Sequence, residues 1–120
     1  DYQDHVKGIN SNKIQHLLNH SIKKSHIQKV KVETLTFVNL IEKYNLKKID
    51  LLCIDVEGYD DKLVLDFLDN SKLRPIIIFE YVHINNKSLK ILIKRLIDEN
   101  YQILRISENV VCYKKNFTIL

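Results

Sequence analysis

The sequence is poor in the residues on which several common kinds of functional site depend. It has only two glycines, Gly8 and Gly58, too few for a glycine-rich loop that cradles a phosphate or a dinucleotide. It has two cysteines, Cys53 and Cys112, which form neither a C-x-x-C pair nor a metal-binding spacing with histidine. Their apolar surroundings predict two reduced, buried thiols. The G-x-S-x-G and H-E-x-x-H motifs are also absent, which argues against the corresponding hydrolases and zinc peptidases.

Long hydrophobic runs are lacking as well. No stretch is long enough to cross a membrane, and no charged-then-apolar leader is found in the sequence. A chain of 120 residues that is 45% hydrophobic and 28% charged is typical of one globular domain. We therefore expect a cytoplasmic protein without a membrane partner. The chain begins with Asp1 rather than methionine, a first indication that it is part of a longer protein.

Positive charge is in slight excess but is not concentrated. The net charge is +4, and the first 48 residues carry an excess of five positive charges. These lysines are scattered and are not interleaved with aromatic residues, so we expect no nucleic-acid partner. Four of the five histidines fall within residues 5–26, but His16 and His20 on one helical face, without a neighbouring carboxylate, make a poor metal site.

Hydrophobic periodicity predicts alternating helices and strands. Apolar residues at spacings of three and four predict helices at residues 11–20, 35–45, 61–70 and 89–97. A half-exposed strand is expected at 27–33, and continuous apolar strands at 49–56 and 75–82. Thr34 is expected to cap the second helix. Residues 101–114 have the pattern of an antiparallel hairpin. Because unbroken apolar strands are typical of parallel sheets with both faces covered, the sequence predicts an α/β fold.

Acidic residues stand where two of these strands end. Asp55 and Glu57 end the 49–56 strand, Glu80 lies near the end of the next, and His83 follows. In an open parallel sheet ligands bind beyond the carboxyl ends of the strands, so these four side chains are expected to rim one pocket. Gly58 permits a tight turn there and lets a ligand or another backbone approach closely.

The carboxylates at this edge have more than one possible use. They can accept hydrogen bonds from a ligand, or take a proton from a substrate hydroxyl if burial raises the pKa of one of them. The structural alternative is that Asp55 caps a helix and Glu57 pairs with a surface lysine. A metal is conceivable, but nothing in the spacing requires one, and we expect none.

The segment from Val32 to Phe67, followed by RPIIIFEYV and LIDENYQIL, resembles the FkbM family of methyltransferases. The resemblance rests on matches that run from residue 34 to residue 101, with the Asp-Val-Glu-Gly block as the most specific part, and covers roughly residues 30–114. The matching positions are Thr34-Leu35, Ile49-Asp50-Leu51, Ile54-Asp55-Val56-Glu57-Gly58, Val64-Leu65, Glu80 and Tyr101.

The resemblance implies a three-layer, Rossmann-like class I methyltransferase sheet that binds S-adenosylmethionine, mostly parallel with a C-terminal antiparallel hairpin. Its members typically methylate a hydroxyl oxygen of a small molecule or sugar. The resemblance implies that Asp55 and Glu57 are catalytic, that Asp55 and Gly58 bind the cofactor, and that Glu80 and His83 lie on the acceptor side. Cys53 stands where the family commonly has lysine, and Asn100 where it usually has glycine.

The family's first two strands, and the glycine-containing cofactor loop between strand and helix, are expected to be missing here. Residues 1–120 are therefore expected to be a single partial domain, the C-terminal half, that binds S-adenosylmethionine weakly or not at all by itself. Two other interpretations stay open. One is a non-catalytic α/β module for binding or assembly, and the other is a domain that uses its acidic strand ends around Mg²⁺.

Overall fold

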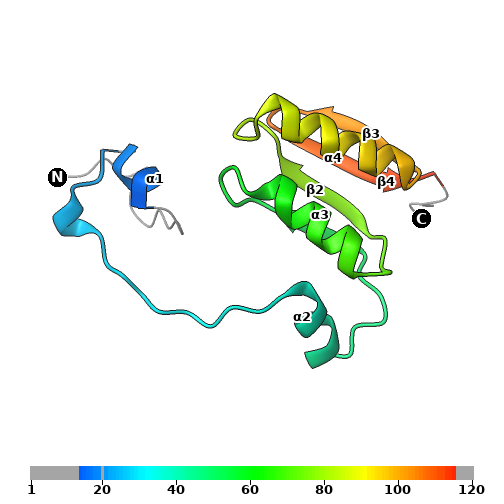
Figure 1. Ribbon diagram of the computed structural model, residues 1–120, viewed down its shortest axis with the longest axis horizontal. Helices are drawn as coiled ribbons and strands as arrows, with labels where there is room; N and C mark the ends of the chain where they lie inside the picture. Colours follow the sequence, from blue (N-terminus) through cyan, green and yellow to red (C-terminus); the bar gives the residue numbers. More distant parts are fainter. Residues whose placement is uncertain (1–13, 20, 116–120) are drawn as a thin grey trace. The chain divides into compact units, whose positions relative to one another are not determined.

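The computed structural model describes residues 14–19 and 21–115, and the chain divides into two compact units at residue 34. The first unit contains a short helix, α1 (Ile14–Asn19), and a single 3₁₀ turn, η2 (Lys24–His26). The helix expected at 11–20 is thus confirmed over residues 14–19 (Figure 1). No helix in the described residues is long and apolar enough to cross a membrane.

The strand predicted at residues 27–33 is wrong. These residues form no helix or strand, and Val30 and Val32 are 74% and 70% exposed. Alternation of apolar and polar residues favours a strand only where a neighbouring strand accepts its hydrogen bonds, and no described strand pairs with this segment. The segment leads into the second unit, which begins at Leu35.

The second unit is an α/β domain with a mixed four-stranded sheet of order β1-β2-β4-β3 (Figure 1). β1 pairs parallel with β2, and β4 lies antiparallel to both β2 and β3. The predicted helices and strands of this unit are confirmed, with α2, β1 and β2 shorter than predicted and α3 and α4 longer. They are α2 (Phe37–Lys43), β1 (Leu51–Ile54), α3 (Asp60–Asn70), β2 (Ile76–Glu80), α4 (Asn86–Asp98), β3 (Tyr101–Ile106) and β4 (Asn109–Lys114).

Local capping fixes where two of the helices begin. Thr36, not Thr34, caps α2, because its side-chain oxygen accepts a hydrogen bond from the Asn39 N–H at 3.2 Å. Asn85 caps α4 in the same way by accepting from the Ser88 N–H at 3.0 Å. The predicted cap at Thr34 is therefore displaced by two residues, within the usual uncertainty of a helix end read from sequence.

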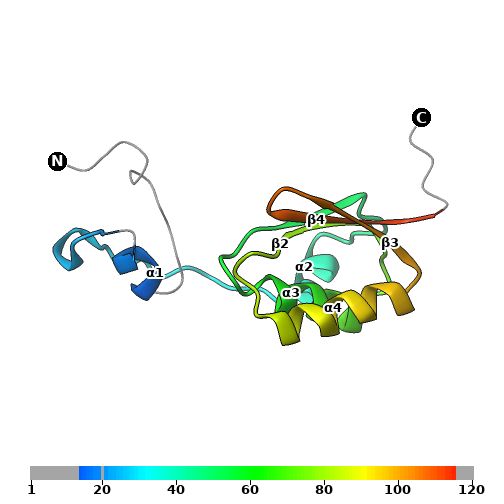
Figure 2. The same cartoon turned by 90° about the horizontal axis from the view of Figure 1, so that it is seen from above.

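All three helices of this unit lie on the same side of the sheet, as Figure 2 shows. α3 and α4 pack against strands, whereas α2 packs against α3. Between the helices and the strands lies a core in which Phe67, Phe79, Leu92 and Leu96 are fully buried. Phe37 of α2 joins this core through an edge-to-face contact with Phe67, with ring centroids 5.3 Å apart. Alternate strand residues point into this core, as the two-residue period of a strand requires.

The opposite face of the sheet is apolar and has no helix of the second unit over it (Figure 2). The register aligns one row of side chains across all four strands of this face: Cys53, Ile78, Val111 and Leu104. Further exposed apolar side chains on this face are Leu51, Ile106 and Tyr113. We call these residues the open face.

β1 differs from its prediction in a related way. The expected strand is covered on both faces, whereas the observed β1 is an edge strand with Leu51 52% exposed and Cys53 exposed. Burial of both cysteines is therefore wrong for Cys53 and confirmed for Cys112, and both thiols are free. An apolar strand with an open edge and an open face is unusual, since such surfaces promote association.

At the end of the sheet where β2 begins, Arg74 joins α3 to α4. Its guanidinium donates to both carboxylate oxygens of Glu99 at 2.9 and 3.0 Å, and to the Leu68 and Ser71 carbonyls at the end of α3. Arg95 donates to Glu99 as well. These charge-assisted hydrogen bonds hold the pKa of Glu99 down at about 2. The network fixes the spacing of the two helices that carry the core.

Candidate functional site

The loop between β1 and α3 makes a tight turn beyond the end of β1. Glu57 and Gly58 both have positive φ, at 54° and 90°. Such backbone geometry suits glycine and is uncommon for glutamate. The Gly58 N–H donates to the Asp60 carboxylate at 3.2 Å, which holds the turn against the start of α3. The turn therefore aims the Glu57 side chain in a fixed direction.

Asp60 connects this turn to the neighbouring strand. Its side chain is fully buried, and its second oxygen accepts from the Glu80 N–H at 3.3 Å. Burial raises the pKa of this carboxyl, while hydrogen bonds from the backbone, Gly58 first among them, oppose the rise. Asp60 thus ties the end of β1 to the end of β2 and positions the residues around it.

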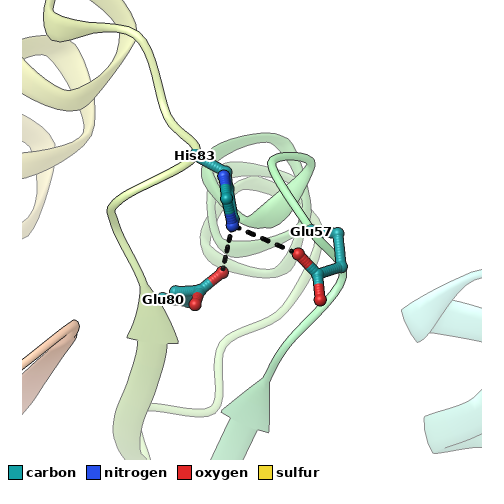
Figure 3. Close-up of side chains that lie close together, drawn as sticks. All are labelled: Glu57, Glu80 and His83. Carbon is teal, nitrogen blue, oxygen red and sulfur yellow. Dashed lines mark ion pairs between the residues drawn. The ribbon is translucent and has the colours of Figure 1, made fainter. Parts of the chain in front are cut away.

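Glu57, Glu80 and His83 come together at this edge of the sheet (Figure 3). The His83 Nε2 atom lies 3.3 Å from Glu57 Oε2 and 3.8 Å from Glu80 Oε2. One ligand atom from each residue can be chosen so that all three lie within 4.8 Å of one another. We call these three residues the strand-end cluster. Glu80 ends β2, and Glu57 and His83 lie in the loops that follow the adjacent parallel strands β1 and β2.

Glu80 is the most enclosed member of the strand-end cluster. Its side chain is 17% exposed, against 42% for Glu57 and 54% for His83. Burial raises its pKa, His83 lowers it, and the negative charges of Glu57, Asp55 and Asp60 raise it further. The Glu80 Oε2 atom is buried and has no hydrogen-bond partner among the described residues. The same oxygen faces the His83 Nε2 atom at 3.8 Å, which is too far for a hydrogen bond.

Gly58 brings the two loops into contact. A Cβ atom at this position would lie 3.0 Å from the His83 carbonyl oxygen and 3.2 Å from the His83 Cβ. With any other residue here, the backbone of His83 would have to shift by a few tenths of an ångström, and the positive φ is a second reason for glycine. The sequence predicts that Gly58 lets either a ligand or another backbone approach closely. The structure shows the approach of another backbone, that of His83.

Asp55 lies at the end of β1 but outside the cluster. It is exposed, and its charge contributes to the raised pKa of Glu80. The predicted convergence is thus confirmed for Glu57, Glu80 and His83. Two hollows of the described residues lie elsewhere. One hollow lies on α4, lined by Leu89, Lys90, Ile93, Lys94 and Ile97, and the other lies by residues 47–50 and 73–75.

The residue that sequence reasoning missed is Asp60. In the sequence it is one of two adjacent acids, Asp60 and Asp61, near the expected start of a helix, and nothing there gives a reason to bury it. The available signal is an acid two residues after a glycine at a strand-to-helix turn. At that position a carboxylate can accept from the free N–H groups of the turn. The contact with the Glu80 N–H depends on the pairing of β1 with β2 and is visible only in three dimensions.

The fold and this edge define an α/β domain that gathers carboxylates and a histidine at the carboxyl ends of two parallel strands. The chain matches the family model of the methyltransferase FkbM domain over residues 2–105, which is most of its length. It belongs to this family of methyltransferase domains. No curated protein and no solved structure matches the chain.

Proposed function

We propose that this protein is part of an S-adenosylmethionine-dependent methyltransferase that acts on a hydroxyl oxygen of a small molecule or sugar. The observation that carries the proposal is the match to the methyltransferase FkbM domain over residues 2–105. The free thiols of Cys53 and Cys112 fit a reducing compartment, so the proposal includes a cytoplasmic location.

The topology supports a class I methyltransferase sheet. β4, the last strand in sequence, lies between β2 and β3 and runs antiparallel to both. β1, β2 and β3 therefore share one direction. An otherwise parallel sheet that receives its last strand antiparallel is what the resemblance to this family implies. In this interpretation β1 to β4 are the last four strands of the complete sheet.

The site supports the chemistry of hydroxyl methylation. In this reaction the acceptor oxygen forms a bond to the methyl carbon, the carbon–sulfur bond breaks, and the hydroxyl proton passes to a base. S-adenosylmethionine would supply the methyl group. Asp55, exposed beside the cluster, can accept hydrogen bonds from the cofactor's ammonium or ribose hydroxyls. Glu57 can orient the acceptor hydroxyl, since positioning and electrostatics supply most of the rate in such a step.

Glu80 is the best candidate to hold the acceptor proton. Burial raises the pKa of its carboxyl, which moves it toward the working range of a general base. His83, whose imidazole faces both Glu57 and Glu80, borders the acceptor side in this proposal. Gly58 contributes by keeping the loop close to His83 rather than by presenting a phosphate-type cradle.

A further stretch of polypeptide would complete the cofactor site. Gly58 is the only glycine in the described residues, and it is occupied by its contact with His83. The open edge of β1 and the open face are where additional strands and helices would pack. We therefore propose that residues 1–120 alone bind S-adenosylmethionine weakly or not at all.

The test is calorimetric titration of S-adenosylmethionine into residues 1–120 and into the product of the whole coding region. We expect binding to the longer protein, weakened at least tenfold in its Asp55→Asn variant. Asp98→Asn, which removes the same charge at the exposed end of α4, is the matched control and should bind normally. If neither protein binds, the methyltransferase proposal fails and the non-catalytic binding module replaces it.

A further inference from the structure

We propose that the strand-end cluster binds one divalent transition-metal ion through Glu57 Oε2, Glu80 Oε2 and His83 Nε2. The two distances from the imidazole nitrogen to the carboxylates fit a shared ion. Metal–nitrogen and metal–oxygen bonds of about 2.1 Å place two ligand atoms about 3.0–3.4 Å apart at octahedral or tetrahedral angles, and up to about 4.2 Å apart when opposite. The His83 nitrogen lies 3.3 and 3.8 Å from the two carboxylate oxygens.

A second observation points to a cation at this place. Glu80 Oε2 is buried and receives no hydrogen bond from any described residue. A buried carboxylate oxygen without a partner is costly, so native structures rarely keep one unsatisfied. A metal ion between Glu80 and His83 gives this oxygen a partner. It also offsets the mutual repulsion of Glu57 and Glu80.

A protonated His83 satisfies the cluster less well. The single Nε2–H can point at only one of the two carboxylates that face it. Both distances exceed the range of about 2.7–3.2 Å in which N–H···O hydrogen bonds lie. Two carboxylate oxygens that converge on one imidazole nitrogen form the arrangement that a metal ion takes.

The ligands are held in place by the fold. Asp60 ties the Glu57–Gly58 turn to the Glu80 N–H, and the contact of Gly58 with His83 fixes the second loop against the first. A site whose loops are already fixed loses little entropy when the ion binds. The fully buried Asp60 acts here as a positioning residue.

The donor set selects the class of ion. One imidazole nitrogen and two carboxylate oxygens suit Zn²⁺ or Mn²⁺, whereas Ca²⁺ and Mg²⁺ prefer oxygen ligands alone. Three protein ligands leave coordination positions open, and the exposure of Glu57 and His83 leaves them accessible. If the proposed function holds, an acceptor hydroxyl could occupy such a position. Binding of the ion itself does not depend on that function.

The experiment is titration of Mn²⁺ and, separately, Zn²⁺ into chelator-treated protein without S-adenosylmethionine. Mn²⁺ should broaden the amide NMR signals around residues 57–58, 80 and 83. Zn²⁺ should bind with micromolar or tighter affinity. Glu80→Gln and His83→Gln should each weaken binding at least about tenfold. Because His83 is half exposed, its variant is expected to fold even if Glu80→Gln does not.

Two controls separate this site from other ligands in the chain. Asp98→Asn removes an equal charge elsewhere on the surface, and His26→Gln removes an imidazole from the histidine-rich first unit. Both should leave the broadening and the affinity unchanged. Broadening confined to residues 1–34, or an affinity that Glu80→Gln and His83→Gln leave intact, would overturn the proposal. Because the metal titration contains no cofactor, its failure does not affect the methyltransferase proposal. Failure of the cofactor titration, in turn, does not affect the metal-site proposal.

Discussion

Single residues decide whether the two loops of the site meet, and Gly58 is the sharpest case. Gly58→Ala places a Cβ 3.0 Å from the His83 carbonyl oxygen, closer than a normal contact between carbon and oxygen. It also gives alanine a φ of +90°, which is strained for any residue with a Cβ. We expect the free energy of unfolding to fall by about 1–3 kcal/mol. Chemical denaturation measures this. Lys87→Ala, on the exposed side of α4, is the control and should change stability by less than about 0.5 kcal/mol. A fully stable Gly58→Ala would show that the loops do not need this approach.

Glu80 should make stability depend on pH in a direction opposite to that of an ion-paired carboxylate. Its pKa is raised in the folded state, mainly by burial. A raised pKa means that the folded state favours the neutral acid. Its contribution is therefore complete below the unfolded pKa of 4.5 and is lost as the pH rises through the folded value.

The neutral variant Glu80→Gln isolates this effect. It should equal the original protein in stability at pH 4 and exceed it by about 1–2 kcal/mol at pH 7.5, in the presence of a chelator. Urea denaturation at both pH values measures the difference. Bound metal should remove the advantage, because the ion satisfies the ionised carboxylate. An advantage that is already full at pH 4 would mean that the ionised carboxylate is not the cause.

Sequence reasoning found most of the site because its residues follow strands that are easy to recognise. The apolar runs at 51–54 and 76–80 mark two strands, and parallel pairing then brings their carboxyl ends together. Glu57, Glu80 and His83 could be named on that basis. The burial of Asp60 could not, because it depends on a backbone N–H of the adjacent strand.

At the scale of helices and strands, the quality of each prediction follows the length of its pattern. α4 shows apolar residues at 89, 92, 93 and 96, and its prediction is confirmed. The segment 27–33 shows only three apolar residues in alternation and forms no strand. A short alternating pattern does not show whether a neighbouring strand is present to stabilise the segment as a strand. The same reason explains β1, whose apolar composition predicts cover on two faces although only one is covered here.

The spacing of α3 and α4 depends on the carboxylate of Glu99. Glu99→Gln keeps the shape but weakens the hydrogen bonds from Arg74 and Arg95, so the free energy of unfolding at pH 7 should fall by about 1–3 kcal/mol. The pKa of Glu99 is lowered to about 2, so its stabilisation is complete above 4.5 and is lost as the pH falls through about 2.

Thermal or urea denaturation between pH 7 and pH 2 tests this. The original protein and Glu99→Gln should converge in stability as the pH falls from 4.5 towards 2. The neighbouring Asp98→Asn should lose little at any pH, since Asp98 is an exposed residue at the end of α4. A gap for Glu99→Gln that stays constant down to pH 2 would place the effect in side-chain packing instead.

At the scale of the whole molecule, the open face is an apolar surface that we expect further polypeptide to cover in a complete domain. Its central row, Cys53, Ile78, Val111 and Leu104, crosses all four strands and has no helix of the second unit over it. Burial of such a row is a large hydrophobic gain, at about 25 cal/mol per Å² of apolar surface. The proposed further polypeptide is therefore expected to cover this face as well as to supply the cofactor loop.

The reactivity of the two cysteine thiols tests whether the open face is covered in the longer protein. Cys112 is fully buried, and burial raises the pKa of its thiol to about 12, so it should resist alkylation and aromatic disulfide reagents. Cys53 is exposed on the open face. Native residues 1–120 should thus show one rapidly reacting thiol, and Cys53→Ser should show none. In the product of the whole coding region, the thiol of Cys53 should react at least tenfold more slowly, because helices packed on the open face would exclude the reagent. If Cys53 reacts equally fast in both proteins, the open face is a surface of the mature protein, and the cofactor loop must join the domain elsewhere.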